Sequence, residues 1–179
     1  MKSGLLERLK GGDLRSIGRA NEAAQLVLKK PELFQELFGG MTDGDPLIRM
    51  RAADAAEKVS SKHPEYLQPF KARLLNKVAM VPQQEVRWHT AQMLAYLTLT
   101  PKERDRTARL LFSWIENEKS NIVKVLSLQA LAGFAQQDKY LRSKVVSLLN
   151  KFVADGSPSL KSRSKKILKE FAARKPGKT

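Results

Sequence analysis

The sequence IRMRAA, residues 48–53, decides the fold because its pattern returns three times along the chain. The copies are VRWHTA at 86–91, VKVLSL at 123–128 and LKSRSK at 160–165, so successive copies begin 38, 37 and 37 residues apart. Each copy opens a run with small or apolar residues at its first, sixth, ninth and twelfth positions, apart from Lys165 at the sixth position of the last copy. This spacing is typical of one face of an α-helix, and its return at a fixed interval predicts a stack of similar units.

A second kind of helix is expected between these segments. The sequence KPELFQ at 30–35 returns as HPEYLQ at 63–68, and TPKE at 100–103 and QDKY at 137–140 open the later equivalents. Proline suits the first turn of a helix, because the N–H that it lacks has no partner there. Together the two kinds predict ten helices in five pairs: 3–10 with 13–29, 31–40 with 46–60, 64–79 with 83–98, 101–117 with 120–135, and 138–154 with 158–173.

The expected fold class is all-α, in one repeat domain. No segment alternates apolar and polar residues as a half-buried strand does. The first copy, where Arg15 takes the place of Ile48, is degenerate, as suits a repeat that caps one end of a stack. We expect a single domain over 1–173 and a frayed basic tail at 174–179, with repeats at about 3–29, 31–60, 64–98, 101–135 and 138–173.

These segments resemble the HEAT repeat family, whose units combine an apolar helix, a turn with Asp and Pro, and Val-Arg followed by Ala and Leu. The closest copy is DPLIR at 45–49 with Ala53 and Ala56, and EVR at 85–87 with Ala91 and Leu94 is nearly as close. The resemblance implies a right-handed α-solenoid of about five antiparallel helix pairs, with the Val-Arg helices lining a concave face. It also implies a scaffold or adaptor, or, in a minority branch, a DNA glycosylase for alkylated bases.

Stacked pairs would bury two apolar faces in each unit. The side chains expected to fill this core are Phe34, Leu37, Phe70, Leu74, Leu111, Trp114, Ile115, Val145, Leu148 and Phe152. Trp114 belongs to this set because a buried indole is usually structural.

The third, fourth and seventh positions of each repeated helix are expected to point away from the core, onto the concave face. They supply a candidate partner-binding set: Met50, Arg51, Asp54, Trp88, His89, Gln92, Val125 and Gln129. Two interpretations of its apolar members stay open. They pack sideways between adjacent helices, or they form a partly exposed stripe in which Trp88 anchors a bound partner.

Positive charge defines a second candidate surface. The 179 residues include 33 Lys and Arg against 18 Asp and Glu, a net charge of +15. The candidate polyanion-binding residues are Arg87, Lys124, Lys161, Arg163, Lys165, Lys166 and Lys169, and Arg51 joins them on the nucleic-acid hypothesis. Lysines at i, i+4 spacing repel one another, which a bound nucleic acid would offset. A solubilising cap at the end of a stack explains the same charges.

Arg49 and Arg87 have a structural interpretation as well. In the HEAT-like arrays that this sequence resembles, an arginine at this place commonly pairs with a carboxylate of a turn. The resemblance therefore implies ion pairs of Arg49 and Arg87 with carboxylates, for which Asp45 and Glu85 are close enough in sequence.

The composition argues against most catalytic chemistry. Cys is absent and there are two His, so neither a thiol nucleophile nor a Cys- or His-rich metal site is expected. No phosphate-binding glycine loop occurs, so no cofactor is expected. A glycosylase would need a carboxylate among aromatic side chains, for which Asp54 beside Trp88 is the one candidate pair.

The sequence therefore predicts a non-catalytic scaffold that binds a protein segment, which could be acidic, on its concave face. Nucleic-acid binding and, less favoured, a glycosylase are the alternatives. No run reaches the roughly 18 apolar residues of a membrane helix, so we expect a cytoplasmic protein with no membrane partner and no identified small-molecule substrate.

Overall fold

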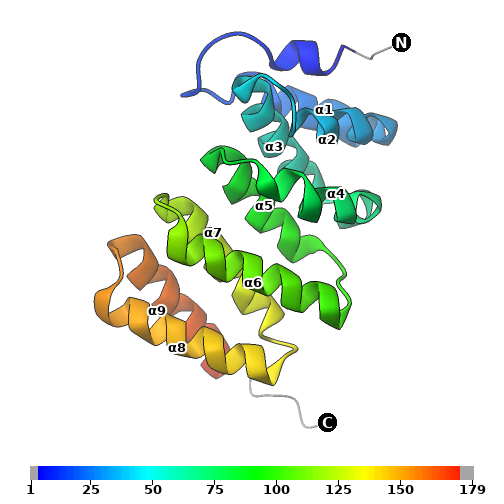
Figure 1. Cartoon of the computed structure of the whole chain (residues 1–179). Coiled ribbons are helices and arrows are strands. Elements are labelled where there is room, and N and C mark those ends of the chain that lie inside the picture. Colours follow the sequence, from blue (N-terminus) through cyan, green and yellow to red (C-terminus); the bar gives the residue numbers. More distant parts are fainter. Residues whose placement is uncertain (1–3, 174–179) are drawn as a thin grey trace. The chain divides into compact units, whose positions relative to one another are not determined.

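In the computed structural model, which describes residues 4–173, the chain forms two compact units, Met1–Thr98 and Leu99–Thr179. All regular elements within the described residues are helices, and none of those residues forms a strand (Figure 1). The all-α prediction is confirmed. The predicted tail at 174–179 lies outside the described residues.

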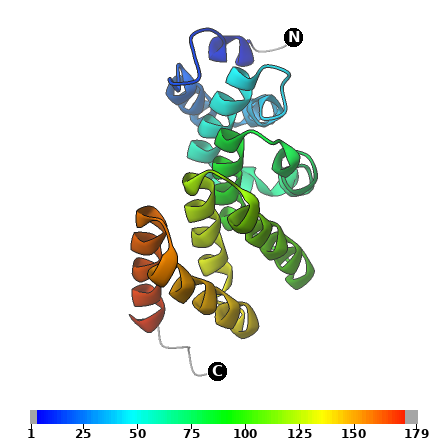
Figure 2. The same ribbon diagram turned by 60° about the vertical axis from the view of Figure 1, so that its left-hand side comes forward.

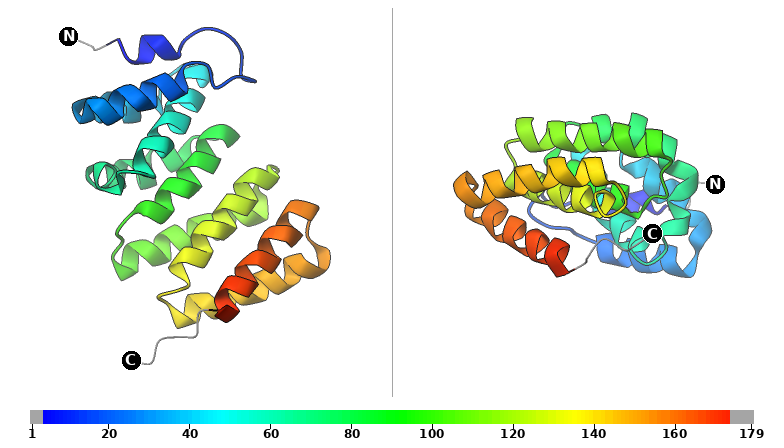
Figure 3. Two further views of the ribbon diagram at one scale, coloured as in Figure 1. Left: turned by 180° about the vertical axis from the view of Figure 1, so that it is seen from behind. Right: turned by 90° about the horizontal axis from the view of Figure 1, so that it is seen from below.

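The first unit is organised around one central helix, α3 (Pro46–Ser60). It packs against α1 (Ala20–Lys29), α2 (Phe34–Gly40) and α5 (Gln84–Tyr96). The view from behind shows α3 and α5 lying side by side (Figure 3). The remaining elements are η1 (Leu6–Leu9), η2 (Pro31–Leu33), η3 (Pro64–Tyr66), η4 (Gln68–Phe70), α4 (Lys71–Asn76) and η5 (Val78–Met80), where η marks a 3-10 helix.

The second unit consists of two antiparallel hairpins (Figure 1, Figure 2). The first pairs α6 (Pro101–Asn117) with α7 (Asn121–Phe134), and the second pairs α8 (Lys139–Asp155) with α9 (Pro158–Ala173). Helix α7 also packs along α9, so the two hairpins share one core.

Local capping explains why several helices begin where the sequence predicts. The Asp45 side chain accepts a hydrogen bond from the Leu47 N–H at 2.8 Å and starts α3. Thr100 and Glu103 form a capping box at the start of α6. The predicted bounds 46–60, 101–117 and 158–173 match α3, α6 and α9.

Three predicted helices differ from the structure. The helix expected at 13–29 begins only at Ala20, because the loop before it is bent at Gly18, where φ is +50°. The helix expected at 64–79 is broken into η3, η4, α4 and η5. The break between η3 and α4 falls around Pro69, since an internal proline lacks an N–H and clashes with the preceding turn. The helix expected at 3–10 is the single 3-10 helix η1 within the described residues.

The predicted core is largely confirmed. Phe34, Leu37, Leu74, Leu111, Trp114, Ile115 and Val145 are buried, whereas Phe70, Leu148 and Phe152 are half-buried. In the first unit the ring centroids of Phe38 and Phe70 lie 4.7 Å apart, with the Arg73 guanidinium 5.3 Å from the Phe38 centroid. Each unit therefore has its own packed centre.

Candidate functional site

Five of the predicted concave-face residues line one cleft of about 300 Å³ in the first unit. We call it the N-terminal cleft; its walls are the loop 14–17, α3 and the first turns of α5. The predicted residues in it are Met50, Arg51, Asp54, Trp88 and His89. Their positions on two neighbouring helices bring them together, as the helical spacing predicts.

Arg51 is a structural residue and not an exposed cation, because only 2 % of its surface is accessible. Its guanidinium donates hydrogen bonds to four backbone carbonyl oxygens of the N-terminal segment. The distances are 2.6 Å to Leu9, 2.6 Å to Gly11, 3.2 Å to Ser16 and 3.3 Å to Asp13. The expectation that Arg51 faces a partner or a polyanion is therefore corrected: the residue holds one wall of the cleft in place.

Glycine makes this close approach possible. A Cβ atom on Gly18 would lie 2.6 Å from the Arg51 Cζ, and the positive φ of Gly18 disfavours other residues there. The loop 14–17 is thus folded against α3 by Arg51 and leaves the side chains of Leu14 and Ile17 51 % and 43 % exposed.

Asp54 is not an isolated carboxylate. It is 8 % exposed, and its Oδ2 lies 2.6 Å from the Lys58 Nζ, which also donates to the Asn21 Oδ1 at 2.6 Å. The Asp54 Oδ1 is 3.7 Å from the His89 Nε2. Burial lowers the pKa of His89 to about 4, so its ring is neutral at pH 7.

The burial of Met50 and Trp88 distinguishes the two interpretations of the apolar members of the partner-binding set. Met50 lines the cleft but is only 6 % exposed, so its assignment to an exposed partner-binding stripe is corrected. Trp88 is half-buried, lines the cleft and meets the His89 ring edge-on at a centroid distance of 5.8 Å. Trp88 is the large aromatic side chain that a ligand in this cleft would touch.

The other three predicted partner-binding residues lie outside the cleft. The Gln92 Nε2 is 3.4 Å from the Glu57 Oε1. Val125 belongs to the second unit, where it lines a shallow hollow of about 190 Å³ with Ile122 and Leu126. Gln129, also in the second unit, accepts a hydrogen bond from the Arg163 Nη1 at 2.9 Å.

The repeated arginines contact backbone oxygens. The Arg49 Nε donates to the Gln83 Oε1 at 2.9 Å and its Nη1 to the Asp43 carbonyl at 2.8 Å, while Asp45 caps α3 instead of pairing with Arg49. The expected Arg49–Asp45 ion pair is therefore wrong. The Arg87 Nε donates to the Val81 carbonyl at 3.0 Å, and burial lowers the pKa of Arg87. Arg87 lies half-buried in the first unit, apart in sequence from the basic residues of the second.

The predicted polyanion-binding residues of the second unit fall into two groups. Lys165, Lys166 and Lys169 are exposed on α9, and none has a carboxylate partner within the described residues. We call these three the α9 lysines. The remaining members, Lys124, Lys161 and Arg163, are half-buried.

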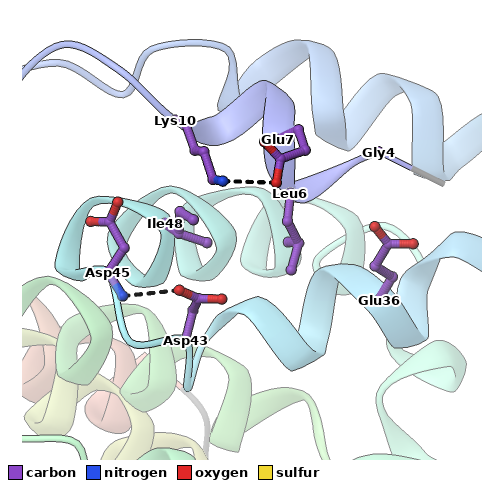
Figure 4. A pocket seen from close by; sticks show the side chains of 8 residues that line it. All are labelled: Gly4, Leu6, Glu7, Lys10, Glu36, Asp43, Asp45 and Ile48. Carbon is purple, nitrogen blue, oxygen red and sulfur yellow. Dashed lines mark hydrogen bonds and ion pairs between the residues drawn. The ribbon is translucent and has the colours of Figure 1, made fainter. Parts of the chain in front are cut away.

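A second hollow in the first unit, of about 450 Å³, was not predicted from the sequence. Figure 4 shows its four carboxylates, Glu7, Glu36, Asp43 and Asp45, around the apolar Leu6 and Ile48. The Glu7 carboxylate pairs with the Lys10 Nζ at 2.8 Å, and the Asp43 Oδ1 accepts from the Asp45 N–H at 2.9 Å. The carboxylates come from η1, α2 and the turn after it, and no sequence periodicity connects them.

No family model, curated protein or solved structure matches this chain. Among residues 4–173, no helix is long and apolar enough to cross a membrane, and no three His, Asp or Glu side chains gather as metal ligands would.

Proposed function

We propose that the chain is a non-catalytic binding module and that a segment of a partner protein occupies the N-terminal cleft. The observation that carries this proposal is the half-buried Trp88 in the wall of a cleft of about 300 Å³, facing a loop with exposed Leu14 and Ile17. Protein interfaces concentrate their binding energy on such aromatic anchors in partly desolvated pockets.

The composition of the cleft favours a peptide that carries both apolar and polar groups. Its apolar members are Leu14, Ile17 and Trp88, and Arg15 and Glu85 bring one charge of each sign. An apolar side chain of the partner would sit against Trp88 and Ile17, and its backbone or a polar neighbour would meet the charged residues. The volume suits one or two side chains.

The proposal includes the repeat architecture. HEAT-like helix pairs stacked into a right-handed solenoid would align the repeated helices side by side, and this agrees with the packing of α3 on α5 and of α7 on α9 within their units. It would also place Trp88 on the inner curve.

The burial and charge of Asp54 and His89 favour a binding function over base excision. A glycosylase needs a carboxylate able to stabilise a cationic sugar, whereas Asp54 is buried and already neutralised by Lys58 at 2.6 Å. The neighbouring His89 ring is uncharged at neutral pH.

Selection of linear peptides from a displayed library against the intact chain tests the proposed function. Peptides that bind in the cleft should lose about 10-fold or more in affinity to the Trp88→Ala variant, which corresponds to about 1.4 kcal/mol or more. Tyr140→Ala is the matched control, because Tyr140 is an exposed aromatic residue of the second unit. Selected peptides that bind Trp88→Ala as tightly as the parent chain would refute the proposal, provided that the free energy of unfolding shows both variants folded.

Nucleic-acid binding through the second unit is the second candidate function. The specific observation is the exposed, unpaired α9 lysines in a unit whose 18 basic and 7 acidic residues give a net charge of +11. Replacing all three with Gln should weaken DNA binding at low salt and reduce the slope of log K against log[salt] by about 2 to 3. Unchanged affinity and slope would indicate that these lysines only solubilise the end of the chain.

A further inference from the structure

Tyr140, in the first turn of α8, is the most exposed large apolar side chain among the described residues, at 74 %. The Lys144 Nζ lies 4.3 Å from its ring centroid. Tyr66 occupies the corresponding place in the HPEY sequence, but it is half-buried, stacked on His63 at 4.7 Å and 6.1 Å from the Phe34 ring. Tyr66 is therefore part of the packing of the first unit, whereas the ring of Tyr140 is open to solvent.

Basic side chains surround this ring. A small hollow of about 80 Å³ between α6 and α8 is bordered by Tyr140, Arg104, Arg109 and Lys144. Lys139, the residue before Tyr140, is exposed as well.

The acidic residues at this hollow are already engaged. Asp105 forms an ion pair with Arg109, and Asp138 accepts a hydrogen bond from the Leu141 N–H at 2.9 Å. Arg104 donates to the Gln137 Oε1 at 3.2 Å. Lys139 and Lys144 have no carboxylate partner in the part of the chain that is described, so their charge is available to a phosphate.

We propose that Tyr140 is a stacking platform for an unpaired base and that Lys139 and Lys144 bind the flanking phosphates, so that this face of the second unit takes single-stranded nucleic acid. An exposed aromatic ring among cations is the arrangement by which proteins bind single strands without reading their sequence. As a base stacks on the ring, the flexible Lys144 ammonium moves from the ring to a phosphate. A base inside a duplex is covered on both faces, so a duplex gains nothing from Tyr140.

The inference rests on the second candidate function, and the experiment separates the two. Fluorescence polarisation at low salt compares a labelled oligo-dT of about 15 nucleotides, within the range of single-strand site sizes, with a duplex of equal length. Tyr140→Ala should weaken binding of oligo-dT by about 5-fold to 150-fold and leave binding of the duplex unchanged. Tyr140→Trp should retain affinity, and its added indole emission should be quenched by the single strand. Met80→Ala, which removes an exposed apolar side chain of the first unit, should bind both DNAs as the parent chain does.

Equal oligo-dT affinity of Tyr140→Ala and the parent chain would overturn the inference. If the variant with all three α9 lysines replaced by Gln then binds both DNAs more weakly, the second candidate function stands without Tyr140. If the parent chain binds neither DNA at low salt, both are overturned.

Discussion

Replacement of Arg51 with Met tests the role of this residue in building the cleft. The variant keeps an unbranched apolar stem but removes all N–H donors from four carbonyl oxygens, two of them only 2.6 Å from the guanidinium. A hydrogen bond to a charged donor contributes about 1.5–3 kcal/mol, and leaving a buried acceptor unsatisfied costs about as much. The bond to the Leu9 carbonyl is buried, whereas the other three involve part-buried groups that water can reach after the substitution.

We therefore expect Arg51→Met to lower the free energy of unfolding by about 2–3 kcal/mol, most of it from the lost hydrogen bond to the Leu9 carbonyl. This value already subtracts the gain from no longer burying the charge of the guanidinium. Urea denaturation followed by circular dichroism measures this change. Limited trypsin digestion measures the loop directly, because a released loop should be cut faster at Arg15. Arg109→Met is the matched control; Arg109 forms an exposed ion pair with Asp105, so its loss should cost less than about 1 kcal/mol. A change below about 0.5 kcal/mol in Arg51→Met, with an unaltered rate of cleavage at Arg15, would refute the reasoning.

Four further substitutions test the packing and electrostatics of single sites. Trp114→Ala should destabilise the chain by about 3–5 kcal/mol because the indole is buried, whereas Trp88→Ala should cost about 1 kcal/mol; equal losses in urea denaturation would contradict the assignment. Burial keeps the folded-state pKa of His89 at about 4, below the unfolded value of about 6.5. The neutral His89 ring therefore makes its full contribution to the free energy of unfolding above pH 6.5. This contribution is lost as the pH falls from 6.5 toward 4, because the unfolded chain then binds a proton that the folded chain does not. His89→Gln should flatten the decline between pH 6.5 and 5, and an NMR titration of the ring near pH 6.5 would disprove the shift. Gly18→Ala should destabilise the chain by about 1–2 kcal/mol from its positive φ, and by more if Arg51 is displaced; a neutral result would show that the loop adapts.

The helices that could be predicted from the sequence are those whose ends are set by neighbouring residues. Pro46 after Asp45, and Pro101 after Thr100, mark the starts of α3 and α6 through contacts within four residues. The start of α1 could not be found in this way. It depends on Gly18 folding against Arg51, a residue 33 positions further along the chain, and no local pattern reports such a contact.

The same distinction applies to the candidate site. Helical spacing correctly brings Met50, Asp54 and Trp88 to one cleft, because neighbouring helices present equivalent positions to the same side. Spacing does not reveal that Arg51 is hydrogen-bonded to the loop 14–17, so it overstates the exposure of this residue. Tyr140 was missed because it occupies the same place in the repeat as Tyr66, and the packing around each ring distinguishes them.

The most direct test of the central claim is a ¹H–¹⁵N NMR titration of the intact chain with a peptide selected against it. If the N-terminal cleft receives a partner segment, the Trp88 indole N–H and the amides of the loop 14–17, α3 and the first turns of α5 should shift together in proportion to occupancy. Shifts confined to the second unit, with an unmoved Trp88 indole signal, would contradict the account.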